Sequence, residues 1–155
     1  MHGHGSGPSA SATLAPTRGN TTAGTVMFHT HAQGLFVHAR VTGLKPGQEH
    51  GFHIHEKGDC SSGDGMGTGG HFNPGAKPHA HHGQADRHAG DLPNLKADAQ
   101  GAADMRFTVK GPTIGSGATD IIGKGLIVHA MPDDYTTQPT GNAGARIACA
   151  VIAAR

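Results

Sequence analysis

The sequence predicts an all-β fold, a sandwich or flattened barrel that carries two long loops. The first observation is composition, because 26 glycines and 9 prolines lie between short apolar runs in a chain of 155 residues. Such a composition indicates many turns joining short strands. The second is periodicity, since apolar residues recur at every second position and no segment of adequate length repeats with the helical period of about 3.6 residues. The length favours one domain.

The first residues of the chain, 1–13, are small and polar and are predicted to form a flexible N-terminal segment. They include His2 and His4, so an alternative is an arm that gathers metal ions. The folded domain is expected to cover residues 14–155. These opening residues do not have the pattern of a secretory signal peptide.

The first expected hairpin pairs residues 25–31 with residues 34–44 across a turn at 32–34. In its second half, Leu35 and Val37 alternate with polar residues, which is typical of a half-buried strand. A Lys-Pro-Gly turn then leads to a third strand over residues 48–55. Four histidines on or beside these strands are interpreted as solvent-facing or core-edge residues rather than metal ligands: His29, His31, His38 and His50.

Regular structure is expected to stop after His55 and to resume at Leu92. A loop of that length inside a compact domain needs something else to order it, such as a metal or a disulfide. Regular structure is predicted first over residues 92–98 and then in three further strands, and a second long loop over 131–145 precedes the last of these strands. Their residues are 104–111, 125–130 and 146–153.

The charges exclude some partner classes. The chain has 12 Lys and Arg residues against 11 Asp and Glu residues. No basic stripe and no apolar run of about 20 residues occurs, which argues against nucleic-acid and membrane partners. Cys60 and Cys149 are the two cysteines, and their number alone leaves a disulfide and two free thiols equally open.

Fourteen histidines are an excess that needs a chemical account, because histidine is the commonest metal ligand. His53 and His55 are two residues apart on a predicted strand, so their side chains point the same way and can reach one ion. His129, in another predicted strand, can approach the same ion. Three imidazoles with an open position suit a redox-capable copper.

A second set of candidate ligands lies downstream of the first. Three imidazoles and a carboxylate make a closed four-coordinate set that suits zinc. Its members are His71, His79, His88 and Asp91. Spacing alone leaves His81 and His82 as rivals for the place of His79.

Five motifs in sequence order resemble the copper/zinc superoxide dismutase family along nearly the whole domain: GFHIHEKGDC, GGHFNP, RHAGDLPNL, GLIVHA and GNAGARIACAVI. The short step from Glu56 to Cys60 and the short loop after His129 are similar to the bacterial secreted form. The resemblance implies a Greek-key, Ig-like β-sandwich, described equally well as a flattened eight-stranded barrel.

The resemblance also implies the ligand sets. Copper would be held by His53, His55, His71 and His129. Zinc would be held by His71, His79, His88 and Asp91, with His71 bridging the two metals as an imidazolate. His79 is preferred to its rivals because its interval to His88 matches the family.

Three further roles follow from the resemblance. Asp133 would be the carboxylate that links a copper histidine to a zinc histidine, which fixes ring orientation. Cys60 and Cys149 would form the disulfide of the family. Arg146 would be the cation beside the copper that holds a small anion.

The implied activity is the disproportionation of superoxide, a small anion, by a copper that is alternately reduced and oxidised, with His71 releasing the copper and taking up a proton. A homodimer and a periplasmic or secreted location are implied as well. The alternative is a non-catalytic protein that binds or stores copper and zinc, which extra histidines at 2, 4, 81 and 82 favour. Arg146 and Asp133 argue against storage, because storage needs neither. A copper-only relative is disfavoured by the complete zinc set.

Overall fold

The computed structural model of the chain describes residues 7–81 and 83–155, and it confirms the all-β fold class. The strands are β1 (Ser9–Pro16), β2 (Ala23–His31), β3 (Gly34–Thr42), β4 (Glu49–His50), β5 (Phe52–His55), β6 (Leu95–Lys96), β7 (Ala103–Val109), β8 (Gly125–His129), β9 (Arg146–Val151) and β10 (Ala153–Ala154). The helical structure in these residues is one short 3₁₀ turn, Met66–Thr68.

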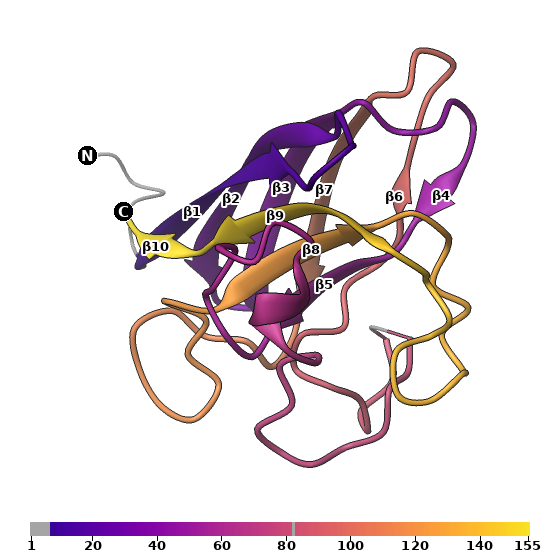
Figure 1. The fold of residues 1–155 in the computed structure, drawn as a ribbon. Helices are drawn as coiled ribbons and strands as arrows, with labels where there is room; N and C mark the ends of the chain where they lie inside the picture. The colour runs from indigo at the N-terminus through magenta and orange to yellow at the C-terminus, as the bar shows by residue number, and fades with distance from the viewer. Residues whose placement is uncertain (1–6, 82) are drawn as a thin grey trace.

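The strands form a curled antiparallel sheet in the order β5-β8-β9-β1-β2-β3-β7, with β10 also paired to β1 (Figure 1). β4 and β6 make a separate two-stranded sheet. β3 has β7 as its neighbour and β9 returns to pair with β1, so the sheet contains the crossovers of a Greek key. The hairpin of β2 and β3 is confirmed, with Ala32 and Gln33 between the two strands.

The predicted third strand, 48–55, is one element in the prediction and two in the structure. Glu49–His50 pairs with β6, whereas Phe52–His55 pairs with β8, and Gly51 separates them. A Cβ atom at Gly51 would lie 2.7 Å from the Cβ of Ala143 and 3.3 Å from the Cβ of His129. The chain changes sheets here because only glycine allows the loop that follows β8 to pack so closely.

The flexible segment predicted over residues 1–13 extends too far along the chain. β1 begins at Ser9, and its residues pair with β2 and β10. Ala10 and Ala12 are buried, while Ser9, Ser11 and Thr13 alternate with them. This is a strand pattern of period two, but its apolar members are small, so composition suggested a polar tail. His2 and His4 lie outside the described residues.

The core lies between the two halves of the curled sheet and is built from the inward residues of each strand. Fully buried members include Phe28 of β2, Val37 of β3, Ile54 of β5 and Leu126 of β8. Burying each such side chain contributes about 1.5–3 kcal/mol. On β7, Val109 is buried and Met105 and Phe107 pack against the core. Among the described residues, no helix is long and apolar enough to cross a membrane.

The long loops 56–94 and 131–145 lie side by side against β5 and β8 (Figure 1). The disulfide between Cys60 and Cys149 is present and ties the first of these loops to β9, across a sequence separation of 89 residues. Closing a loop of that size is worth roughly 4–5 kcal/mol in the chain-entropy account. The edge of β5 that faces away from β8 is covered by the same loop, because Phe72 N–H donates to Ile54 O and Ile54 N–H donates to Gly90 O.

Candidate metal centre

Strand β5 and its loop neighbours bring the predicted histidines together. His53 and His55 alternate with the core residues Phe52 and Ile54, so both imidazoles leave the core on the same side. Isolated bridges pair His53 with Asp91 and His55 with His71. His129 ends the neighbouring strand, β8. The ladder along β5 therefore places donors from three distant parts of the chain at one point.

Four histidine nitrogens at this point are buried and have no hydrogen-bond partner. They are His53 Nδ1, His55 Nε2, His71 Nε2 and His129 Nε2. Donor atoms of these four residues lie within 4.8 Å of one another. A buried polar atom without a partner carries a cost of about 1–3 kcal/mol. Four of them facing one another fit a cation at their centre.

The partners of the opposite ring nitrogens decide which nitrogen faces inward. His55 Nδ1–H donates to Gly69 O at 2.8 Å, and His129 Nδ1–H donates to Gly144 O at 3.1 Å. His53 Nε2–H donates to the Asp133 carboxylate at 2.7 Å. Because carbonyl and carboxylate oxygens can only accept, each of these rings turns its lone pair toward the shared point.

The electrostatics of the site keep these rings neutral. Burial is the largest cause that lowers the pKa of His53 and of His55 well below the ordinary value, and the neighbouring His71 is the second. Burial also lowers the pKa of His129 to about 4. Because a metal binds the neutral imidazole, these rings are ready to act as ligands at neutral pH.

The second predicted set also converges. Asp91 Oδ1 lies 3.1 Å from His71 Nδ1, 2.7 Å from His79 Nδ1 and 3.6 Å from His88 Nδ1, and His71 Nδ1 is 3.2 Å from His88 Nδ1. Ligands placed tetrahedrally around zinc at its usual bond lengths are about 3.3 Å apart. The spacing of these four atoms therefore fits zinc.

A second group of donors within 4.8 Å contains His53 in place of His88. We assign His53 to the first set because its Nε2 is already paired with Asp133, while its unpartnered Nδ1 faces the other three nitrogens. His88 then completes the second set. With this assignment, His71 has a nitrogen in each set.

The rivals of His79 are separated from it by the structure. His79 is 2 % exposed and lies within the second set, whereas His81 is an exposed side chain whose ring packs edge-on to Tyr135. His82 lies outside the described residues. Burial would lower the pKa of His79, but hydrogen bonds with Asp133 and Asp91 outweigh it and raise the pKa to about 9. Burial would raise the pKa of Asp91, yet its bonds with His71 and His79 hold it well below the usual value.

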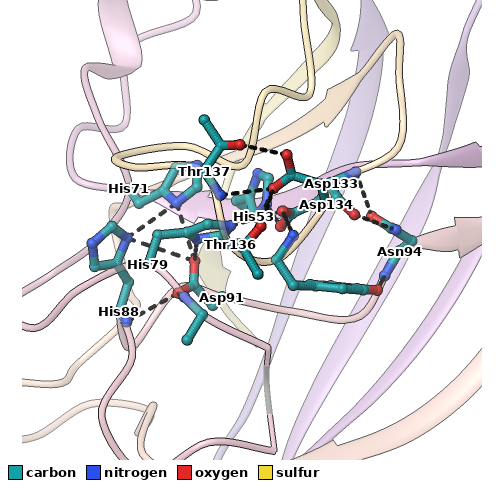
Figure 2. A network of polar contacts seen from close by, with 12 residues as sticks. His53, His71, His79, His88, Asp91, Asn94, Asp133, Asp134, Thr136 and Thr137 are labelled. Carbon is teal, nitrogen blue, oxygen red and sulfur yellow. Dashed lines mark hydrogen bonds and ion pairs between the residues drawn. The ribbon is translucent and has the colours of Figure 1, made fainter.

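The Asp133 carboxylate joins the two sets (Figure 2). Its Oδ2 accepts from His53 Nε2 and its Oδ1 from His79 Nε2, both at 2.7 Å, and all three side chains are fully buried. A carboxylate in this position orients one ring of each set. The structure thus places Asp133 between one histidine of each set.

The sequence did not identify the residues that hold Asp133 and its partner His79 in place. Asn94 is buried and binds the backbone of Asp133 through both ends of its amide. Gln138 does the same for the backbone of His79. Asn94 lies within the quoted motif RHAGDLPNL, which was the available signal, whereas nothing in the local sequence marks Gln138.

His29, His31, His38 and His50 belong to neither donor set. The first three lie on the outward side of β2 and β3, as expected. His50 is more buried than a core-edge residue, at 2 % exposure. Its Nδ1–H donates to His129 O at 2.9 Å and its Nε2 accepts Lys45 N–H at 3.2 Å, so it supports the strand that ends in His129.

Arg146, the first residue of β9, lies beside the first set. Its Nη1 donates to Gly65 O, Thr68 Oγ1 and Gly69 O at 3.0, 3.0 and 2.6 Å. Gly69 O also accepts from His55, so one carbonyl links the guanidinium to a histidine of the set. Burial lowers the pKa of Arg146. The other guanidinium nitrogens make no hydrogen bond to a described residue and can bind an anion.

Comparisons with known proteins agree with this geometry. The family model "Copper/zinc superoxide dismutase (SODC)" matches residues 22–152. The extracellular superoxide dismutase [Cu-Zn] of Drosophila melanogaster is 44% identical over 137 residues, which cover 83% of this chain and 74% of the fly protein. The superoxide dismutase-like protein YojM of Bacillus subtilis is 40% identical over 124 residues, 77% of this chain, and the match spans 63% of YojM, less than two thirds of its length.

Solved structures are similar over nearly the whole chain. The clock protein EA4 has a TM-score of 0.85 and 39% identity, covering 99% of this chain and 98% of its own. A superoxide dismutase-like protein from Bacillus subtilis has a TM-score of 0.82 and 35% identity, covering 97% and 99%. From the extent of the family match and these identities, the chain belongs to the copper/zinc superoxide dismutase family.

Proposed function

We propose that this protein is a superoxide dismutase, an oxidoreductase that converts two superoxide anions and two protons to oxygen and hydrogen peroxide. The observation that carries the proposal is the group of four buried, unpartnered imidazole nitrogens, one of which belongs to a ring shared with a second donor set. Two metals held by one shared ring suit a redox centre better than a simple metal store.

The ligands are assigned by the chemistry of each donor set. His53, His55, His71 and His129 would hold copper, because imidazole donors with room for another ligand suit copper. His71, His79, His88 and Asp91 would hold zinc, because three imidazoles and a carboxylate close a tetrahedral site. When bound, copper supplies one-electron transfer in both directions, while zinc supplies positive charge and no redox chemistry.

The residues of the chain perform the remaining steps. Arg146 binds the incoming anion through its unused N–H groups and keeps it beside His55. His71 holds and releases a proton at Nε2, the nitrogen that faces the first set, while Nδ1 stays directed at the zinc donors. Asp133 keeps His53 and His79 oriented while this proton moves.

A second candidate function is copper and zinc binding without catalysis. It is favoured by the relative that is named a superoxide dismutase-like protein rather than a dismutase. Arg146 distinguishes the two, because a protein that only stores metal does not need a cation anchored beside the metal with free N–H groups.

The expected location is the periplasm or the extracellular space. The Cys60–Cys149 disulfide supports an oxidising compartment, and the fly relative is named as extracellular. A homodimer is proposed from the resemblance to the family.

The test is to load the metal-free protein with copper and zinc, measure both by elemental analysis, and follow the decay of a pulse of superoxide. We expect one copper and one zinc per chain and fast decay. Protein loaded with zinc alone is the control. If the protein with both metals bound did not speed the decay of superoxide relative to this control, the dismutase proposal would be contradicted and the binding function would remain.

A further inference from the structure

Gly141 lies directly against the contact between Asp133 and His79. A Cβ atom built on Gly141 would overlap Asp133 Oδ1 and would lie 2.6 Å from both Asp133 Cγ and His79 Nε2. These are the atoms of the hydrogen bond that joins the carboxylate to the zinc set. We propose that Gly141 is a positioning residue of the metal centre, whose missing side chain allows Asp133 to link the two metal sites. The inference rests on the metal assignment proposed above.

The backbone of Gly141 cannot move away from this contact at low cost. Gly141 N–H donates to Thr137 O at 2.7 Å, and Gly141 O accepts Asp134 N–H at 2.9 Å. Both bonds hold residue 141 in the loop that carries Asp133. Its φ of +79° is a left-handed conformation that glycine adopts readily.

The two groups that a side chain at 141 would meet are also fixed from behind. Asn94 Nδ2 donates to Asp133 O and Asn94 Oδ1 accepts Asp133 N–H, each at 3.0 Å, and Tyr135 N–H donates to Asp133 Oδ1 at 2.7 Å. The backbone of His79 is held by Gln138 at 2.7 and 2.6 Å. A methyl group at 141 would therefore separate the carboxylate from the imidazole, because hydrogen bonds hold the backbones of all three residues in place.

The effect should be unequal at the two metals. The overlap falls on Oδ1, which binds His79, while Oδ2, which binds His53, is not among the three nearest atoms. Loss of an outer hydrogen-bond partner of a metal ligand typically lowers metal affinity by about 10–100-fold. We therefore expect Gly141→Ala to weaken zinc binding by at least about tenfold and to weaken copper binding less.

Two other glycines provide matched controls. Gly123 has a φ of +79° and Gly117 a φ of +78°, and a Cβ at either position meets nothing within 4 Å. Gly123→Ala and Gly117→Ala therefore carry the same backbone cost as Gly141→Ala without the steric one. Neither residue contacts the metal centre.

The experiment uses cobalt(II) as the probe for the zinc site, read by its visible d–d absorption and by competition with a chelator, together with a copper titration of the same proteins. We expect Gly123→Ala and Gly117→Ala to match the original protein and Gly141→Ala to lose cobalt affinity at least about tenfold. Equal affinities in all three variants would overturn the inference. If the original protein bound neither metal, the proposed function itself would fail, which is a separate result.

A double variant tests whether Gly141 acts through Asp133. In the Asp133→Ala background the carboxylate is gone, so adding Gly141→Ala should cost little more cobalt affinity than Asp133→Ala alone. Additive losses would contradict a role exerted through Asp133. The new methyl group fills space that the carboxylate vacates, so the double variant should fold even if Gly141→Ala alone does not.

Discussion

Asn94 makes a pair of hydrogen bonds to the backbone of Asp133, donating from Nδ2 to the carbonyl and accepting the amide N–H at Oδ1, each at 3.0 Å. Asn94 also donates its own N–H to the Tyr135 hydroxyl at 2.9 Å. These bonds connect the last residue of the first long loop to the start of the second, so the Asp133 carboxylate lies between the two donor sets with a defined direction.

Replacing Asn94 with alanine is expected to destabilise the metal-free protein by about 2–3 kcal/mol, because two buried backbone groups lose their partners. Zinc affinity should fall as well, since Asp133 then loses its orientation. Urea unfolding and a zinc titration measure the two effects. Gln100→Ala, at an exposed position, is the control. A loss of stability no larger than in this control would contradict the role assigned to Asn94.

Arg146→Ala is expected to slow superoxide consumption by roughly 10–100-fold while copper stays bound, because the cation that attracts and holds the anion is lost. The rate of the original protein should also fall as salt is added, and this dependence should flatten in the variant. Stopped-flow or pulse-radiolysis decay at several ionic strengths measures both. Arg40→Ala removes the same charge from the exposed part of β3 and should leave the rate nearly unchanged. Equal slowing in the two variants would point to net charge rather than to a local site.

Removal of His88 is expected to empty the zinc site before the copper site, since His88 belongs to the second donor set alone. Elemental analysis of His88→Ala should give copper near one per chain and zinc near zero. His79→Ala should behave in the same way. His81→Ala, at an exposed position outside both sets, should keep both metals. Loss of zinc in His81→Ala with retention in His79→Ala would reverse the assignment between these two residues.

The metal-free protein should be most stable between pH 6.5 and 7. Burial lowers the pKa of His129 to about 4, so below pH 6.5 the unfolded chain takes up a proton that the folded protein resists. This residue alone removes roughly 3 kcal/mol of stability by pH 4. Hydrogen bonds with Asp133 and Asp91 outweigh burial and raise the pKa of His79 to about 9, so its contribution is present below pH 6.5 and is lost as the pH rises through 9.

Urea unfolding in the presence of a chelator, from pH 4 to pH 9.5, measures this profile. If the free energy of unfolding rose as the pH was lowered from 6.5 to 4, the burial of neutral histidines would be contradicted. His129→Gln removes a group with a lowered pKa, so the acid side of the profile should become shallower.

Replacing Cys60 and Cys149 by serine is expected to lower the free energy of unfolding by roughly 4–5 kcal/mol, the chain-entropy value for a loop of this length. The start of the 56–94 loop would lose its tie to β9, and Arg146 would lose order because its acceptors Gly65 and Gly69 lie in that loop. Chemical denaturation with and without a reductant measures the change. An unfolding midpoint that does not respond to the reductant would contradict a stabilising disulfide.

The sequence by itself determined the fold class, most of the strands and the residues of both donor sets. The two apolar runs on either side of residues 32–34 identified the hairpin of β2 and β3. Alternation of period two identified the buried face of β3, because a strand buried on one face places its apolar residues on that side. The spacing of His53 and His55 placed two imidazoles on the same side of one strand. The interval from His79 to His88, which matches the family that the chain resembles, then favoured His79 over its rivals, and the structure places His79 with the other members of its set.

Tertiary structure alone decided which nitrogen of each ring faces the metal position. The choice depends on the partner of the opposite nitrogen, and Gly69, Gly144 and Asp133 lie between 14 and 80 residues away from the rings they bind. The clamp of Asn94 on Asp133 and the close contact at Gly141 are invisible in the sequence for the same reason. Local sequence sets the type of a residue and the face of the strand on which it lies. The direction of an imidazole lone pair is set by neighbours that only folding brings near.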